Sequence, residues 1–565
     1  MSRRFTAGAV ATATALALLG AVPARPAAAA PDAAGDVTEY TVVAEAGTGA
    51  AEAMAAIETA GGTVTGSTAD VGMYQVVTDD AEFAAKVAAA PALLGAAEKR
   101  AIGYAPRQRF DAVEQEHRIA GAASAGAAGR RGTRMDPLDD KLWGLPMMRA
   151  DKSRRVEPGD RRVTVGILDT GVDGQHPDLK PNFSYSLSRN FAPDIPDIDG
   201  PCEVESCLDP VDRDDSGHGT HVAGTIGAAA NRFGLSGVAP NVTLVALKGG
   251  QDSGYFFLDS VVNALVYAGD AGIDVVNMSF YIDPWLYNCL DNPADSAEEQ
   301  ASQRATIEAV NRALRYAHKR GVTLVGSLGN NHEDLGDPRP DSSSPNYGGT
   351  PRLRTIDNDT CWDLPVEGAH VIGVSALGPS KAKADYSNYG TEEISVAAPG
   401  GWFRDGYGTP THRTYDNTIL SSYPLHVLQE EGAVDADGNI VPDAESYVFK
   451  ECTSAGVCGY YTYLQGTSMA SPHVSGVAAL IVSRYGKRDG HRGGLTLDPD
   501  KVERHLYRTA ADTACPEPRL VSYANEGRSP EWDAYCDGST SFNGFYGHGI
   551  VDAFAAVTRP LHHHH

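Results

Sequence analysis

Short apolar runs rich in β-branched residues alternate with helical patterns through the middle of this 565-residue chain. The predicted helices cover residues 219–229, 258–271 and 301–319. The predicted strands cover 163–168, 242–247, 273–278, 322–326 and 370–374. Strands that are apolar throughout and are separated by helices are typical of a mostly parallel sheet with helices on both faces. We therefore predict an α/β fold, in which ligands bind at the carboxyl ends of the strands.

A smaller domain is expected before this region, within residues 31–106. Strand-like and helical patterns follow one another at 39–43, 50–60, 73–77, 80–90 and 101–104. This order of strand, helix, strands, helix and strand predicts a ferredoxin-like α+β domain. Residues 107–135 are small and carry several arginines. Such a composition is typical of a flexible, exposed linker that is open to proteolytic cleavage.

The first 30 residues have the three parts of a secretory signal. A basic start at Arg3 and Arg4 leads into an apolar stretch at 7–22 and then to four alanines at 27–30. The apolar stretch is too short for a good membrane span, so we expect a secreted, extracellular protein with no membrane partner. At the other end, residues 559–565 form a tail whose histidines resemble the remnant of an expression tag.

The chain carries 47 Lys and Arg against 73 Asp and Glu, a formal net charge of −26. Because nucleic-acid affinity depends on cationic side chains, this balance argues against nucleic acids and anionic membranes as partners. All eight cysteines lie beyond residue 200, and an even number in a secreted chain favours disulfides. Of about a hundred possible connectivities, short loops and elimination favour one. It pairs Cys202 with Cys207, Cys452 with Cys458, Cys515 with Cys536 and Cys289 with Cys361.

Three polar motifs stand at predicted strand or helix ends. They are residues 167–173 (ILDTGVD), 215–224 (DSGHGTHVAG) and 466–474 (GTSMASPHV). Together, and in this order, they resemble the motifs of the subtilisin-like serine peptidases. The resemblance covers about residues 136–558. It implies a secreted serine endopeptidase that is made as a self-processing zymogen, with the 31–106 region as its inhibitory propeptide.

The resemblance assigns a catalytic triad. A serine hydroxyl is a poor nucleophile until a histidine takes its proton, and that histidine needs a buried carboxylate to orient it. Asp169 is the orienting acid, His218 the general base and Ser468 the nucleophile. In the segment 325–330 (VGSLGN), Asn330 matches the side chain that stabilises the oxyanion, with Asn331 as the adjacent alternative.

Peptide substrates of such an enzyme add a strand to exposed edges beside the site. The resemblance places these edges at Ser279, Phe280 and Tyr281 and at Asp252, Ser253 and Gly254. Bulky side chains at 280–282 replace smaller residues of the family, which argues against broad specificity. Three acids follow the oxyanion asparagine and would favour basic substrate residues if they reached the pocket: Glu333, Asp334 and Asp337. The long segments 331–363 and 401–459 are expected to shape the cleft.

Calcium is the cofactor that the resemblance implies, as a structural ion. The ligands would be the side chains of Asp178 and Asn231 and the backbone carbonyls of Ala229, Phe233 and Leu235. Such a set of oxygen atoms is what Ca²⁺ prefers. Other acidic stretches, at 194–199, 209–215 and 435–439, are expected to be solvated loops.

Two other functions compete with this interpretation. Aspartic peptidases use two Asp-Thr/Ser-Gly turns, and three occur here, at 169–171, 215–217 and 252–254, although the helical sequence between them does not suit an all-β enzyme. A catalytically silent binding protein on a peptidase scaffold is the second alternative, and four intact catalytic positions argue against it. The expected partners are protein or peptide substrates and the chain's own propeptide, and we expect a monomer.

Overall fold

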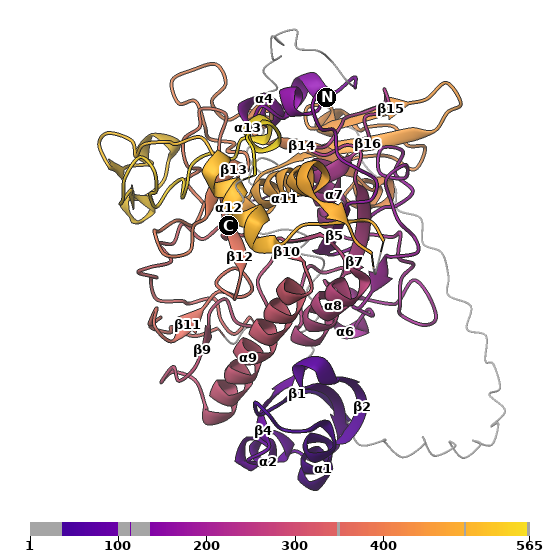
Figure 1. The fold of residues 1–565 in the computed structure, drawn as a ribbon, viewed down its shortest axis with the longest axis vertical. Helices are drawn as coiled ribbons and strands as arrows, with labels where there is room; N and C mark the ends of the chain where they lie inside the picture. Colours follow the sequence, from indigo (N-terminus) through magenta and orange to yellow (C-terminus); the bar gives the residue numbers. More distant parts are fainter. Residues whose placement is uncertain (1–36, 100–113, 115–135, 347–350, 491–492, 562–565) are drawn as a thin grey trace, which may run out of the picture. The chain divides into compact units, whose positions relative to one another are not determined.

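The computed structural model describes residues 37–99, 114, 136–346, 351–490 and 493–561 (Figure 1). The predicted signal, nearly all of the linker and the four terminal histidines lie outside the described residues. The chain divides into a unit at 1–37 and a second unit at 38–565, and the account below concerns the second. Among the described residues, no helix is both long and apolar enough to cross a membrane.

A seven-stranded, all-parallel sheet forms the centre of this unit. Its strands are β5 (Thr164–Asp169), β6 (Arg189–Asn190), β7 (Thr243–Lys248), β8 (Val275–Met278), β10 (Thr323–Ser327), β12 (Val371–Leu377) and β13 (Val396–Pro399). They lie in the order β13-β12-β10-β8-β5-β7-β6. Five of the seven were predicted, and the predicted α/β class is confirmed. The two outer strands, β6 and β13, were not predicted, and they are two and four residues long.

Helices cover both faces of the sheet. They are α7 (His218–Gly227) and α11 (Thr467–Tyr485) on one face, and α8 (Leu258–Ala271) and α9 (Ala297–Lys319) on the other (Figure 1). Neighbouring residues of β5 show the alternation, because Ile167 belongs to the core under α7 and α11 while Leu168 belongs to the core under α8 and α9. Helix α9 begins four residues before the prediction, where Ser296 and Glu299 form a capping box.

The small domain has the predicted order of elements. These are β1 (Thr38–Ala44), α1 (Ala50–Ala60), β2 (Thr63–Thr68), β3 (Met73–Thr78), α2 (Phe83–Ala89) and β4 (Leu93–Glu98). The antiparallel order β2-β3-β1-β4 with two helices is the ferredoxin-like arrangement. Its last strand is β4, whereas the strand predicted at 101–104 lies outside the described residues. Arg312 of α9 donates to the carbonyl of Ala44 (2.9 Å), and Lys99 lies 3.3 Å from Asp259 of α8.

The long segment 401–459 takes part in a second sheet. It contains β14 (Ile419–Tyr423), α10 (Leu425–Glu430) and β15 (Val448–Cys452), and it ends at β16 (Cys458–Leu464). These strands form an antiparallel sheet in the order β14-β16-β15. The hydroxyl of Ser421 in β14 donates to the carbonyl of His221 in α7 (2.7 Å). The insertion therefore packs against the helix that begins with His218.

Shorter elements complete the catalytic region. They are α4 (Gly144–Met147), α5 (Ala150–Ser153), α6 (Pro196–Asp199), β9 (Asn288–Cys289), β11 (Cys361–Trp362), β17 (Lys487–Arg488), β18 (Leu495–Thr496), α12 (Pro499–Thr509), β19 (Leu520–Val521), β20 (Ala534–Tyr535) and α13 (Ala553–Thr558). All four predicted disulfides are present, and no free cysteine remains. The disulfides therefore lie in loops and short hairpins, outside the central sheet.

Candidate active site

Three regular elements bring the predicted triad to the carboxyl edge of the sheet. Asp169 is the last residue of β5, His218 the first of α7 and Ser468 the second of α11. Nδ1 of His218 lies 2.7 Å from Oδ1 of Asp169, which is fully buried. The Ser468 hydroxyl donates to the backbone carbonyl of Ser279 at 3.5 Å, and Ser468 and His218 line one cavity.

Close approach of α7 to the end of β5 makes this contact possible. Oδ1 of Asp169 also accepts a hydrogen bond from the backbone N–H of Thr170 (2.8 Å), which fixes the carboxylate. A Cβ at Gly219 would lie 2.0 Å from the carbonyl oxygen of Gly171. Only glycine therefore fits directly after His218, because any side chain would push the helix away from the strand.

Asn330 follows β10 and faces the start of α11. Its Oδ1 accepts hydrogen bonds from both the backbone N–H and the hydroxyl of Thr467, each at 2.9 Å. This pair of contacts orients the amide next to Ser468, whose own N–H lies at a helix N-terminus. The alternative residue, Asn331, is exposed at the cavity and its backbone bonds to Asn388. The geometry thus favours Asn330 for an oxyanion.

One residue at the site was not found by sequence reasoning. Glu114, from the segment predicted as a linker, is buried with its Oε1 3.6 Å from Nε2 of His218. Burial alone lowers the pKa of His218, but the carboxylates of Asp169 and Glu114 outweigh it and hold that pKa well above the usual range. A histidine kept protonated cannot accept a proton from serine. No pattern around Glu114 signals this role.

The cavity beside Ser468 has a volume of about 390 Å³. Five of the six residues predicted to contact substrate line it: Ser253, Gly254, Ser279, Phe280 and Tyr281. The side chain of the sixth, Asp252, is buried in an ion pair with Lys248 (2.6 Å) and is not available to substrate. Phe280 stacks on Phe256 with ring centroids 4.0 Å apart, so the wall is aromatic. Ile282, in contrast, is buried in the core.

The segment 331–363 reaches the same cavity, as expected from its length. Its contributions include Ser343, Asn346 and Asp363. The three acids that directly follow the oxyanion asparagine do not line the cavity: Glu333, Asp334 and Asp337. Glu333 instead pairs with Arg339 at 2.8 Å. The acidic residue of this segment that meets the cleft is Asp363.

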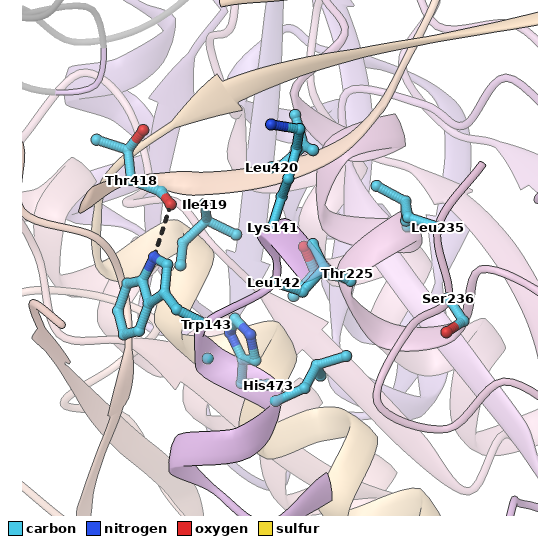
Figure 2. A pocket seen from close by; sticks show the side chains of 13 residues that line it. Lys141, Leu142, Trp143, Thr225, Leu235, Ser236, Thr418, Ile419, Leu420 and His473 are labelled. Carbon is cyan, nitrogen blue, oxygen red and sulfur yellow. Dashed lines mark hydrogen bonds between the residues drawn. The ribbon is translucent and has the colours of Figure 1, made fainter. Parts of the chain in front are cut away.

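A second, smaller cavity contains none of the triad residues. It lies where residues 141–145 meet α7, β14 and the middle of the α11 helix, and Figure 2 shows its side chains. The indole N–H of Trp143 donates to the carbonyl of Thr418 (3.0 Å) across one end of it. His473 lies beside Trp143, and Leu235 and Ser236 lie on the far side of the cavity. This small cavity lies in the packing around α11, and neither a triad residue nor Asn330 lines it.

Two further histidines near the triad, His221 and His473, are buried core residues. Nδ1 of His473 and Nε2 of His221 each lie about 3 Å from a backbone carbonyl. Burial lowers the pKa of His473 to about 4 and that of His221 to about 3. Neither histidine belongs to a group of possible metal ligands among the described residues.

The predicted calcium ligands come together, but the carboxylate oxygens of Asp178 already accept hydrogen bonds. Oδ1 of Asp178 accepts from the Asn231 amide (3.1 Å), and Oδ2 accepts from the Leu235 N–H (3.0 Å) and the Tyr461 hydroxyl (2.7 Å). Burial raises the pKa of Asp178 to about 7. Asp136, near this group and with a buried Oδ2 that has no hydrogen-bond donor among the described residues, was not predicted. This arrangement fits a cation only if the hydrogen bonds to Asp178 open.

A second acidic group differs from the expectation of solvated loops. Asp194 and Asp209 are 5% and 3% exposed, and their carboxylate oxygens accept no hydrogen bond from the described residues, although Asp209 has an ion-pair partner. Glu203 lies within reach of the same point, since one oxygen from each of the three carboxylates lies within 4.8 Å of the others. Lys248 is 3.4 Å from Asp209. Burial and neighbouring acids raise the pKa of Asp194 to about 8. The cluster contains carboxylate oxygen atoms, which are the ligands that Ca²⁺ prefers.

The Asp-Thr/Ser-Gly turns do not form an aspartic-peptidase dyad. Asp169 contacts His218, Asp215 pairs with Arg213 (2.5 Å) and Asp252 pairs with Lys248. Each carboxylate therefore has its own cationic or imidazole partner. Aspartic peptidases need two carboxylates that share one proton, and these three carboxylates do not form such a pair.

Comparisons with known proteins agree with this geometry. The chain matches the Subtilase family over residues 160–549. It is 29% identical to subtilisin DY of Bacillus licheniformis over 372 residues, covering 66% of this chain and 91% of the relative. It is 25% identical to the epidermin leader peptide-processing serine protease EpiP of Staphylococcus epidermidis over 376 residues, covering 66% of this chain and 71% of that one.

Similarity in structure extends further along the chain. The crystal structure of EpiP from Staphylococcus aureus covers 93% of this chain and 98% of its own, with a TM-score of 0.59 at 20% identity. Fervidolysin from Fervidobacterium pennivorans covers 93% of this chain and 61% of its own, with a TM-score of 0.53 at 21% identity. At this level of identity the likeness concerns the fold. With the family match over most of its length, the chain belongs to the subtilase family and is a subtilisin-like serine endopeptidase.

Proposed function

We propose that Ser468 is the nucleophile of this endopeptidase, with His218 as general base and then general acid and Asp169 as the group that orients it. The observation that carries the proposal is the 2.7 Å contact between His218 and Asp169 at a cavity that Ser468 and Asn330 also line. Ser468 Oγ bonds to the carbonyl carbon and its proton passes to His218. The C–N bond then breaks as His218 gives that proton to the leaving amine. Water releases the acyl group by the same steps in reverse order.

Charge on the substrate carbonyl oxygen is stabilised by two donors. One is the side-chain amide of Asn330, whose carbonyl end is held by Thr467. The other is the backbone N–H of Ser468 at the start of α11. Such donors act strongly because they are fixed in place before the charge develops.

Substrates are protein or peptide segments in extended conformation. Residues 279–281 and 253–254 line the cavity, which supports pairing of their segments with a peptide strand on either side. The aromatic wall formed by Phe280 and Phe256 narrows this cleft. These features support an enzyme that selects its substrates.

Before processing, the enzyme is latent. In this proposal residues 1–30 direct secretion, 31–106 form the inhibitory propeptide, 107–135 carry the cleavage site, and 136–558 form a monomeric, extracellular catalytic domain. Contacts of the small domain with α8 and α9 support its role as a chaperone-like partner. The carboxylate of Glu114 beside His218 supports the latency. Cleavage of the linker frees His218 from this second acid.

Calcium stabilises the fold in this proposal. The Asp194 and Asp209 cluster supports one site, because the carboxylate oxygens of these two residues are buried and accept no hydrogen bond from the described residues. The group around Asp178, Asn231, Ala229, Phe233 and Leu235 supports a second, which Asp136 would complete. When bound, Ca²⁺ neutralises the buried carboxylates and cross-links the loops that carry them.

Active-site labelling tests the central assignment. A fluorophosphonate probe added to the processed enzyme should attach to Ser468, as located by mass spectrometry of the digested protein, and should abolish peptide hydrolysis. Ser468→Ala should remain unlabelled and unprocessed. Ser483→Ala is the matched control, because that hydroxyl lies in the same helix but outside the catalytic cavity, and its partners are the carbonyl of Ala479 and the backbone N–H of Asp160. A processed enzyme that resists the probe would instead support the silent binding protein.

A further inference from the structure

One wall of the catalytic cavity contains a carboxylate that the triad does not use. Asp363 lines the cavity together with Ser468 and Asn330, yet it is only 3% exposed. No donor among the described residues reaches its Oδ1. A buried polar atom without a partner is costly, and natural proteins tolerate few of them. Its presence beside a catalytic serine calls for a ligand.

The position of Asp363 relates it to one residue of the substrate. A Cβ at Gly329 would lie 3.6 Å from Oδ2 of Asp363, and Gly329 directly precedes Asn330. The substrate carbonyl being attacked lies between Ser468 and Asn330. The substrate residue that contains this carbonyl is called P1, and its side chain is attached to the Cα next to the carbonyl carbon. That side chain therefore enters the space bounded by Gly329 and Asp363.

Apart from His218, the charged side chains that line the cavity are acidic. Among the described residues that line it, none is lysine or arginine, whereas Asp283, Asp363 and Glu114 are acidic. The two other acids already have partners. Asp283 accepts from the Asn346 amide (2.6 Å) and the Phe256 N–H (2.7 Å), and Glu114 lies beside His218. Asp363 differs from both, and burial raises the pKa of its carboxyl well above the usual range.

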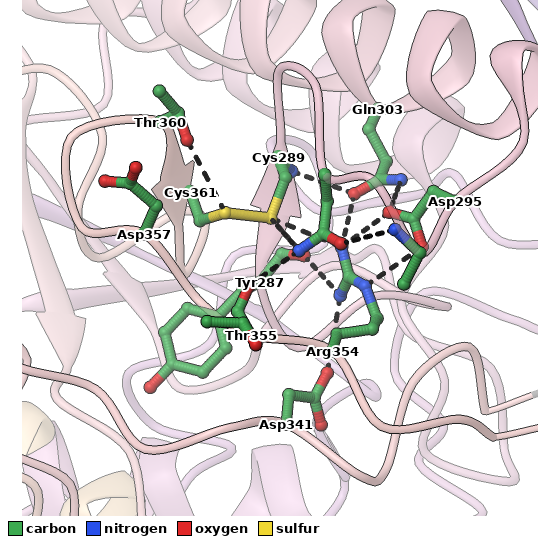
Figure 3. The surroundings of a disulfide bond; sticks show 12 residues. Tyr287, Cys289, Asp295, Gln303, Asp341, Arg354, Thr355, Asp357, Thr360 and Cys361 are labelled. Carbon is green, nitrogen blue, oxygen red and sulfur yellow. Dashed lines mark hydrogen bonds and ion pairs between the residues drawn. A yellow bond between two sulfur atoms is a disulfide. The ribbon is translucent and has the colours of Figure 1, made fainter.

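The nearest buried cation of this segment is committed elsewhere. Arg354 is fully buried, and its guanidinium binds Asp295 at 2.9 Å (Figure 3). The disulfide between Cys289 and Cys361 lies beside this ion pair and ends two residues before Asp363 (Figure 3). The segment that carries Asp363 is thus held at a fixed place, and its own arginine does not neutralise the carboxylate.

We propose that Asp363 is the specificity determinant of the enzyme and binds the cationic side chain of a P1 arginine or lysine. The proposal rests on the function proposed above, since it names the substrate of the same site. A guanidinium or ammonium group supplies both the hydrogen-bond donors and the positive charge that Asp363 lacks. Glu114 does not compete for this role, because its carboxylate lies beside His218 and Gly466.

Kinetics on matched peptides test the proposal. The processed wild-type enzyme is assayed with fluorogenic peptides that differ only at P1, which is arginine, lysine, citrulline or norleucine. We expect kcat/KM for arginine and lysine to exceed that for both neutral residues by about 10²–10³-fold, the effect of pairing one buried charge. Citrulline keeps the shape of arginine without its charge. A wild-type enzyme that prefers norleucine or citrulline would overturn the proposal.

Two variants localise the effect. In Asp363→Asn, kcat/KM for the arginine peptide should fall by about 10²–10³-fold while that for norleucine changes less than about threefold. Asp337→Asn is the matched control, because it removes an exposed acid of the same segment and should change neither value. If Asp363→Asn cleaves the arginine peptide as well as the wild type does, Asp363 is not the determinant.

A probe that needs no variant guards against misfolding of Asp363→Asn. Benzamidine, a small amidinium cation, should compete with the substrate in the wild-type enzyme, whereas benzamide, its neutral analogue, should not. Equal effects of the two compounds contradict the proposal even if the variant cannot be purified. Fluorophosphonate labelling of Ser468 in the same samples separates the two levels of failure. A labelled enzyme without cationic preference refutes Asp363 alone, and an unlabelled enzyme refutes the proposed function.

Discussion

The two sides of the catalytic cleft are built in different ways. The side that carries Asp169, His218 and Ser468 consists of the end of a central strand and the first turns of two buried helices. The opposite side carries Asn346 and Asp363 on irregular segments. A disulfide and a buried ion pair hold that side in place of a sheet. The difference suggests that the chemistry is tied to the core of the fold, whereas the choice of substrate lies in stapled loops.

Removing the nucleophile is expected to have the largest effect of any change to the triad side. Ser468→Ala should lower turnover by about 10⁶-fold, the loss known for the corresponding change in subtilisin. Self-processing should stop as well, which gel electrophoresis and intact mass would show. Its thermal stability should stay close to that of unprocessed wild type, since one hydroxyl is lost at a helix start. Continued processing of the variant at low concentration would point to another protease or another nucleophile.

Breaking the ion pair tests the loop side. Arg354→Met leaves Asp341 buried without its cation and Asp295 with Arg352 alone, and it should lower the free energy of unfolding by about 3–5 kcal/mol. Arg352→Met is the control, because its partly exposed pair with Asp295 should contribute only about 0–1 kcal/mol. Denaturant melts of both variants give the comparison. Similar stabilities would mean that the buried network does not hold this side of the cleft.

A smaller change is expected where the linker meets the triad side. His218 is protonated below its raised pKa, so self-processing of the full chain should accelerate as pH rises through that pKa. Glu114→Gln removes one of the two carboxylates that raise it and should move the midpoint of the pH–rate profile to lower pH. Glu52→Gln, an exposed acid of the small domain, is the control. Coinciding midpoints for Glu114→Gln and the wild type would show that Glu114 does not control His218.

The smallest effect is expected from removal of calcium. A chelator should lower the melting temperature, because a bound ion at about 100 times its Kd contributes about 2.7 kcal/mol. Asp194→Asn should lose most of this shift, and Asn231→Ala should keep it if the ion lies at the Asp194 cluster. The reverse pattern would place the ion at Asp178. The absence of any chelator effect in the wild type would argue against calcium at both sites.

Sequence reasoning was most successful where local pattern and chemistry coincide. Apolar runs predicted five sheet strands, and the motifs containing Asp169, His218 and Ser468 predicted contacts that the fold brings to one edge. It failed for Asp252, whose ion pair with Lys248 four residues earlier depends on tertiary burial. It also misjudged Asp194 as solvated, since burial of a polar loop leaves no periodic signal.

Residues that act through long-range contacts were beyond prediction. Glu114 reaches His218 across 104 positions of sequence from a segment without regular pattern. Asp363 lies close to Gly329 because the Cys289–Cys361 disulfide and the pairing of β9 with β11 hold its segment beside the cleft. The sequence did suggest acids near the oxyanion asparagine as a source of specificity, but it pointed to Glu333, Asp334 and Asp337 rather than to Asp363. Only the packing of the loops separates these candidates.

One kinetic comparison tests most directly whether the two sides do separate work. Asn330→Ala and Asp363→Asn are each assayed with the arginine and norleucine P1 peptides. We expect Asn330→Ala to lower kcat for both peptides alike by about 10²–10³-fold, because the oxyanion is common to them. Asp363→Asn should lower kcat/KM for the arginine peptide alone. If both variants instead reduce both peptides in equal proportion, chemistry and selection are not divided between the two sides.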